Sequence, residues 1–77
     1  MLINLNSIDN VKKFVGVAST LGMTDVDLKS GRYIVSATSI MGIFSLDLTK
    51  PIEIVETNLT KEQRAALVEN FNKIIVK

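Results

Sequence analysis

Apolar residues recur along the chain at two different spacings, which predict strands and helices in alternation. Met1, Ile3 and Leu5 share one face at a period of two residues, and this spacing predicts a first strand over residues 1–5. A helical spacing follows and continues to about Leu21. The apolar stripe of this predicted helix consists of Ile8, Val11, Phe14, Val15, Ala18 and Leu21.

The ends of this helix carry residues that are typical of helix boundaries. Ser7 or Asp9 can cap its first turn, and Gly22 is placed to end it in a left-handed conformation. Gly16 lies inside the helix, where glycine costs about 1 kcal/mol relative to alanine. We therefore expect a close packing contact at Gly16.

The rest of the chain continues the alternation of elements. The remaining predicted elements are two strands, a short helix, a strand and a helix, over residues 24–28, 32–37, 39–46, 52–57 and 60–75. Gly31 suits a turn between the first two of these strands, and Thr60 with Gln63 forms a capping box. The order β-α-β-β-α-β-α predicts an α+β fold with a four-stranded antiparallel sheet covered on one face by three helices. Periodicity alone leaves a ferredoxin-like sheet open as the alternative.

Composition narrows the classes of function. A length of 77 residues predicts a single domain, residues 1–77, and 47% apolar with 22% charged residues favours a globular chain. The net charge of +1 argues against nucleic acid or an anionic membrane as a partner. The chain has neither cysteine nor histidine, and its carboxylates form no ligand pattern, so we expect no metal, no cofactor and no enzymatic activity. No membrane span or signal peptide is evident, which predicts a cytoplasmic protein.

The stretch 39–46 is the hardest to explain as ordinary core. Read as a helix, its apolar residues cover an arc of about 220°, which is too wide to bury completely on a small sheet. These residues are Ile40, Met41, Ile43, Phe44 and Leu46. If Ile43 and Leu46 point into the core, Met41 must be partly exposed. Ser39 occupies the N-cap position of this helix.

The segment Thr38-Ser39-Ile40-Met41-Gly42-Ile43-Phe44-Ser45-Leu46 resembles the regulatory serine segment of HPr. HPr is the small phosphocarrier family of the bacterial sugar phosphotransferase system, and its segment reads roughly Lys-Ser-Ile-Met-Gly-Val-Met-Ser-Leu. The remainder fits in length, in element order and in the turn at Gly31. The resemblance implies the HPr-like open-faced β-sandwich.

The chain departs from this family at the residue that carries the chemistry. The family carries phosphate on a histidine at the start of its first helix, followed by an arginine and a proline. The equivalent segment here is Asn6-Ser7-Ile8-Asp9-Asn10, which has none of the three. Ser7 is no substitute, because a phosphoserine ester does not hold phosphate at the transfer potential of a phosphohistidine. The sequence therefore predicts a protein without phosphocarrier activity.

Two further features of the family map onto this chain through the same segment. Ser39 matches the serine that an ATP-dependent kinase modifies in many Gram-positive HPr proteins, and it is the candidate phosphorylation site. Thr38 stands where the family has lysine. Ile40, Met41 and Phe44 match the surface that meets the phosphotransferase enzymes and a transcriptional regulator, and they form the candidate partner-binding surface.

These features lead to a functional hypothesis and an alternative. We expect a regulatory or protein-binding module related to the sugar phosphotransferase system, with Ser39 as its switch. The alternative is a module that has left that system and either binds an unrelated partner or buries the same apolar patch in a homodimer.

Overall fold

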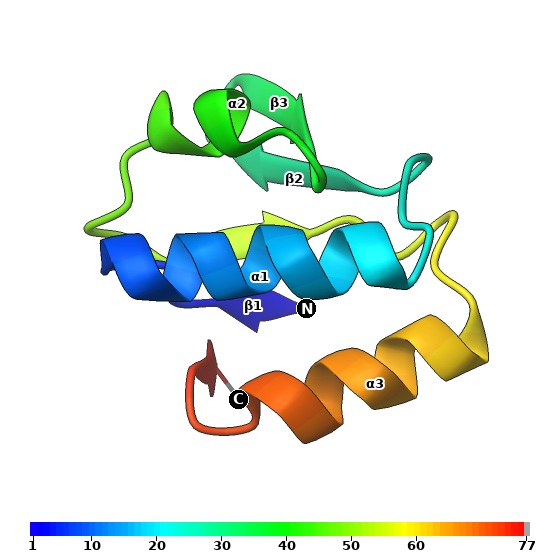
Figure 1. The fold of residues 1–77 in the computed structure, drawn as a ribbon. Coiled ribbons are helices and arrows are strands. Elements are labelled where there is room, and N and C mark those ends of the chain that lie inside the picture. Colours follow the sequence, from blue (N-terminus) through cyan, green and yellow to red (C-terminus); the bar gives the residue numbers. More distant parts are fainter. Residues whose placement is uncertain (77) are drawn as a thin grey trace.

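The chain folds into two layers, an antiparallel sheet and a layer of helices, in a computed structural model that describes residues 1–76 (Figure 1). In chain order the elements are β1 (Leu2–Ile3), α1 (Ile8–Thr20), β2 (Asp27–Ser30), β3 (Tyr33–Ser36), α2 (Ile40–Phe44), β4 (Ile52–Ile54), α3 (Lys61–Phe71) and β5 (Ile75–Val76). The strands are ordered β3-β2-β4-β1-β5 across the sheet. Figure 1 shows α1 between α2 and α3. The α+β class expected from the sequence is confirmed.

The sheet buries one face and leaves the other open. In β4 the buried Ile52 and Ile54 flank the exposed Glu53, and Glu53 pairs with the exposed Lys29 of β2. The covered face and the helices form one core, whose fully buried members include Ile3, Leu5, Val11, Phe14, Ala18, Met23, Val26, Leu28, Ala37, Ile43, Ile52 and Leu67. The expected arrangement of helices against one face of an antiparallel sheet is therefore present.

Helix α1 begins and ends at the residues that the sequence indicates. Ser7 is its N-cap, and the Ser7 hydroxyl accepts a hydrogen bond from the N–H of Asn10 at 3.1 Å. Gly22 adopts a φ of 68°, just beyond the last helical turn. The Met23 N–H donates to the carbonyl of Ala18 at 2.9 Å, which is the long hydrogen bond of a Schellman motif.

The side of α1 that carries Ile8 and Gly16 differs from the sequence interpretation. Ile8 was expected in the buried stripe but is 63% exposed. Gly16 was expected to allow a close contact, but a Cβ placed on it would meet no atom within 4 Å. Gly16 faces solvent, so neither the packing nor the backbone of the described fold requires glycine there.

Replacing Gly16, inside α1, and Gly22, just beyond its end, with alanine should change the free energy of unfolding in opposite directions. Gly16→Ala should raise the free energy of unfolding by about 0.5–1 kcal/mol, because alanine restricts the unfolded chain and suits a helix interior. Gly22→Ala should lower it, because a φ of 68° strains any residue with a Cβ. Urea unfolding of both variants measures the difference. A loss of stability in Gly16→Ala would mean that a contact covers this face of α1.

The C-terminal region corrects the four-stranded prediction. Helix α3 was expected to continue to about Ile75, but it ends at Phe71, and residues 75–76 form a fifth strand. This strand pairs antiparallel with β1, and the Asn4 N–H donates to the Ile74 carbonyl at 2.8 Å. The run Ile74-Ile75-Val76 is β-branched, and β1 would otherwise leave its outer edge unpaired. The sheet therefore has five strands within residues 1–76.

The bounds of the other strands also differ from the prediction. Strands β1, β3 and β4 are shorter than expected, and β2 lies further along the chain, at Asp27–Ser30 instead of residues 24–28. The second begins at Asp27 because residues 24 and 25 belong to a turn, in which the Val26 N–H bonds the Met23 carbonyl at 3.3 Å. The fourth ends at Ile54, although the Val55 N–H still reaches the Asp27 carbonyl at 2.9 Å. A turn therefore sets the start of β2, and hydrogen bonding to β2 continues one residue past the end of β4.

A carboxylate on the surface links the first residue, the loop after β4 and α3. Glu56 Oε1 lies 2.9 Å from Arg64 Nε, and Glu56 Oε2 lies 3.1 Å from the amino nitrogen of Met1. The hydrogen bond from Arg64 and then that from the amino group lower the pKa of Glu56 below its ordinary value of 4.5.

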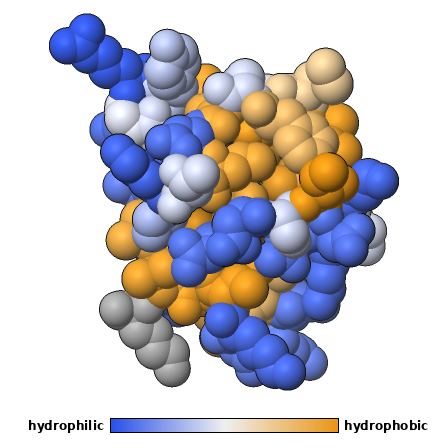
Figure 2. Space-filling view, turned by 90° about the vertical axis from the view of Figure 1, so that its left-hand side faces the viewer, coloured by the Kyte–Doolittle hydropathy of each residue, from blue (hydrophilic) through white to orange (hydrophobic). Residues whose placement is uncertain are grey.

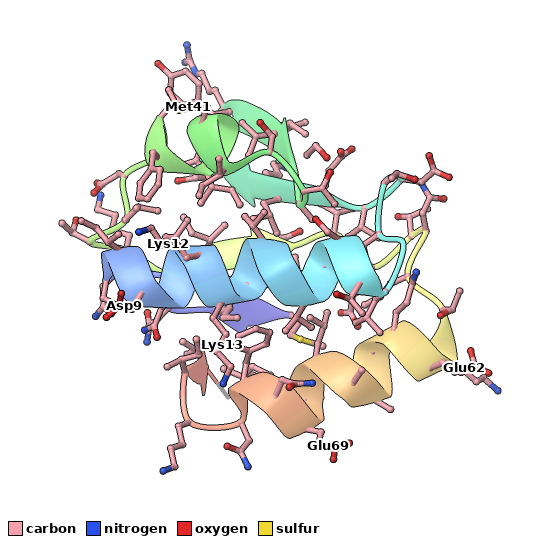
Figure 3. The ribbon with its side chains drawn as sticks, in the orientation of Figure 1. Asp9, Lys12, Lys13, Met41, Glu62 and Glu69 are labelled. Atoms are coloured by element: carbon pink, nitrogen blue, oxygen red, sulfur yellow. The ribbon has the colours of Figure 1, made fainter. Side chains whose placement is uncertain are left out.

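This lowered pKa predicts a pH dependence of stability. The folded state stabilises the charged form of Glu56 more than the unfolded chain does. The ionised carboxylate therefore adds to the free energy of unfolding above pH 4.5, and this contribution is lost as the pH falls through the pKa of the folded state. Glu56→Gln should therefore flatten the decline of the unfolding free energy below pH 4.5. Glu69→Gln is the control, because Glu69 is an exposed residue of α3 (Figure 3) that belongs to neither ion pair. Equal pH profiles for Glu56→Gln and the unchanged protein would contradict the prediction.

Candidate interaction surface and modification site

Ser39 caps the short helix α2, as its position in the sequence indicates. Its backbone is extended, with φ −97° and ψ 101°, and its hydroxyl oxygen accepts a hydrogen bond from the Gly42 N–H at 3.1 Å. The Ile43 N–H donates to the Ser39 carbonyl at 3.0 Å, which closes the first turn. Ser39 is half-buried. Its hydroxyl therefore already serves a structural purpose in the unmodified chain.

Helix α2 lies very close to β3 at Gly42. A Cβ on Gly42 would lie 3.0 Å from Ser39 Oγ and 3.1 Å from the Cβ of Val35. A side chain at this position would push α2 away from the sheet and compress the cap. The absence of a side chain at Gly42 thus lets α2 pack closely against β3 and leaves the Ser39 hydroxyl in its capping position.

The wide apolar arc of α2 is divided between core and solvent. Ile43 is fully buried and Leu46 is 7% exposed, whereas Met41 is 78% exposed. The expectation that inward Ile43 and Leu46 leave Met41 outside is confirmed. Phe44 is 38% exposed and Ile40 is half-buried. The three residues predicted to bind a partner therefore lie together on α2 with graded exposure.

Ile8, which we expected to be buried, is exposed and adds apolar surface to the end of the molecule at which α1 begins. Ile8 is the first residue of α1, and α1 begins at the end of the sheet where α2 leads into the connection to β4 (Figure 1). Figure 2 views this end, and apolar surface covers much of its upper half. The signal for an exposed Ile8 is its position in the first turn of the helix. Figure 3 shows Lys12 leaving α1 on the side of α2, with Met41 pointing out at the top.

The start of α1, residues 6–10, contains no histidine, arginine or lysine. Ser7 is an exposed N-cap, and Asp9 is the acidic residue of the first turn of α1. A carboxylate there repels phosphate. Lys13, further along α1, donates to the Asn70 carbonyl at 3.2 Å and lies 5.3 Å from the centre of the Phe71 ring. Lys13 therefore links α1 to the C-terminal end of α3.

A shallow groove of about 650 Å³ lies between the β2–β3 turn and the connection after α2. Its lining residues are Ser30, Gly31, Arg32, Tyr33, Ser45, Leu46, Asp47 and Lys50. Asp47 accepts hydrogen bonds from the hydroxyl and the N–H of Thr49, and these lower the pKa of its carboxyl. The groove therefore carries charges of both signs, with Arg32 and Lys50 opposing the Asp47 carboxylate.

The described part of the chain has neither a metal-binding cluster nor a membrane-spanning helix. Residues 1–76 contain no group of three histidine, cysteine, aspartate or glutamate side chains placed to hold a metal ion. None of the helices in this part of the chain has the length and apolar character needed to cross a bilayer. Comparison with models of protein families, with curated proteins and with solved structures found no match to this chain.

Proposed function

We propose that the protein is an HPr-like regulatory or protein-binding module of the bacterial sugar phosphotransferase system that does not carry phosphate on histidine. One observation carries this proposal. The segment that resembles the family's regulatory segment forms a short helix that is capped by Ser39 and presents Met41 to solvent. The two-layer fold with one open sheet face supports the HPr-like assignment, with β5 as an added strand. A cytoplasmic location and the absence of enzymatic activity belong to the same proposal.

The partner surface consists of Ile40, Met41 and Phe44. Exposed methionine and phenylalanine side chains are adaptable and apolar, and they are typical anchors of protein recognition. Lys12 leaves α1 on the side of α2 (Figure 3) and supplies a cation to the rim. A fitting partner surface is thus apolar at its centre and acidic at one border. The resemblance suggests the phosphotransferase-system enzymes and a transcriptional regulator as partners.

Phosphorylation of Ser39 is the proposed switch, with a serine kinase as the modifying enzyme. A phosphate on Ser39 Oγ can keep the cap through its own oxygens, which accept from the same backbone N–H groups. Its charge would lie one residue from Ile40 and two from Met41, so it would change the partner surface without unfolding α2. Thr38 stands where the family has lysine, so this chain lacks the positive charge that the family places beside the modified serine.

An intact-mass phosphorylation assay with two arms tests the proposal. One arm contains the upstream enzyme of the phosphotransferase system with phosphoenolpyruvate, and the other contains the family's serine kinase with ATP. We expect one phosphate in the ATP arm, none in the phosphoenolpyruvate arm, and none in Ser39→Ala. Because this variant also removes the cap, circular dichroism must show that it remains folded. Phosphate in the phosphoenolpyruvate arm would refute the loss of carrier activity, and no phosphate in either arm would leave Ser39 as a helix cap only.

A further inference from the structure

Strand β3 forms one edge of the sheet, and part of its backbone faces outward. Pairs in an antiparallel ladder alternate between those that exchange hydrogen bonds and those that direct these groups away. The Ala37 N–H donates to the Val26 carbonyl at 2.9 Å, and the register continues through the pair Leu28↔Val35. Ile34 and Ser36 therefore direct their N–H and C=O groups away from β2.

One of these outward groups is used within the chain. The Ser36 carbonyl accepts from the Ser39 N–H at 3.1 Å, at the start of α2. The Ile34 N–H, the Ile34 C=O and the Ser36 N–H have no backbone partner among residues 1–76. These three groups form a hydrogen-bonding edge that can accept another strand.

The four residues of this edge lack three of the features with which proteins usually prevent strand addition, namely proline, charge and a bulge. They are Tyr33, Ile34, Val35 and Ser36. Ile34 is 61% exposed on the open face, and Tyr33 is 69% exposed. The opposite edge of the sheet is less suitable, because β5 is only two residues long.

The β3 edge is also complementary to itself. In an antiparallel pair of two β3 strands centred on Ile34, each Ile34 lies opposite its counterpart and exchanges both hydrogen bonds with it. Tyr33 then lies opposite Val35, an aromatic and β-branched pair that stabilises sheets, and this pair occurs twice. Arg32 lies opposite Ser36, so no like charges face each other directly. The Ser36 N–H can donate to the Arg32 carbonyl of the other copy.

We propose that this protein forms a homodimer in which β3 pairs antiparallel with β3 of a second copy, through the backbone of Ile34. The two sheets then form one continuous sheet, and the partner surface on α2 is carried once by each copy. This dimer does not depend on the proposed function, and it uses a different surface from Ile40, Met41 and Phe44. A four-residue edge buries far less than the ~1,600 Å² of a standard interface, so the affinity is expected to be weak.

Sedimentation equilibrium over a concentration series up to about 1 mM tests this dimer, since weak binding needs high concentration. We expect the mass to rise from 8.5 kDa toward twice that value. Ile34→Pro removes the outward N–H but no hydrogen bond to β2, and Ile34→Lys places a charge at the two-fold axis. Both variants should stay monomeric at every concentration, whereas Met41→Lys should dimerise as the unchanged protein does.

Amide hydrogen exchange provides a second readout that does not depend on a substitution. Exchange of the Ile34 N–H should slow as concentration rises, whereas that of the Val35 N–H, which already faces β2, should stay constant. If Ile34→Pro fails to fold by circular dichroism, Ile34→Lys decides the question. The proposal is overturned if the unchanged protein stays monomeric, if both Ile34 variants still dimerise, or if only Met41→Lys abolishes the dimer. The last result would assign self-association to α2.

Discussion

Replacing Met41 with lysine and Phe44 with serine should weaken partner binding by about 100-fold or more. Buried aromatic and apolar anchors at the centre of an interface each contribute about 2 kcal/mol or more when they are removed. Met41 is 78% exposed and Phe44 is 38% exposed, so the fold depends on them far less than on the buried Ile43. The double variant should therefore stay folded while it loses the apolar centre of its binding surface. Isothermal titration calorimetry with the two proposed partners, the upstream phosphotransferase enzyme and a transcriptional regulator, measures the loss of affinity.

Val68→Lys is the matched control for this experiment. Val68 is 40% exposed, which is close to the value for Phe44, but it lies on α3 and not on α2. The Val68→Lys variant should bind the proposed partners with unchanged affinity. If added positive charge alone weakened binding, this variant would lose affinity as well. If the double variant binds as well as the unchanged protein, and both have the same circular dichroism spectrum, the α2 surface is not the docking site. Loss of binding in Val68→Lys as well would also contradict the assignment.

The features of α2 could be predicted because they are local. Ser39 precedes an apolar run, and a side-chain oxygen in that position caps a helix wherever the rest of the chain lies. The exposure of Met41 follows from a geometric limit, since a helix with an apolar arc of about 220° cannot bury all of it against one small sheet. Gly22 likewise ends α1 through a conformation that only its own residue type favours.

The features that the sequence did not predict depend on distant neighbours. The end of α3 was placed too late because Ile74 and Ile75 continue a helical stripe, and only the nearby free edge of β1 favours a strand there. Ile8 fits the apolar spacing of α1, but it is the first residue of the helix and no other element of the described fold buries it. The outward backbone of Ile34 depends on the register between β2 and β3, which side-chain periodicity leaves open.

Replacing Phe14 with alanine should lower the free energy of unfolding by about 3–5 kcal/mol, more than the other substitutions proposed above. Phe14 is fully buried at the centre of α1, and its ring centre lies 5.5 Å from that of Phe71 at the end of α3. Its removal leaves a cavity where α1, α3 and the sheet meet. At about 0.05–0.15 kcal/mol per residue, a chain of 77 residues has roughly 4–12 kcal/mol of stability in total. The variant should therefore be partly unfolded at 25 °C if the protein lies at the lower end of this range.

Urea unfolding of a double-mutant cycle separates the contact between the two rings from the cavity. Phe14→Ala, Phe71→Ala and the double variant should show a coupling of about 0.5–1.5 kcal/mol, because the rings meet directly. Phe44→Ala is the control, because it removes a phenyl ring from a partly exposed position. It should lower the free energy of unfolding clearly less than Phe14→Ala does. Equal losses for Phe14→Ala and Phe44→Ala would mean that Phe44 belongs to the core. In that case Ile40 and Met41 would remain as the partner surface on α2.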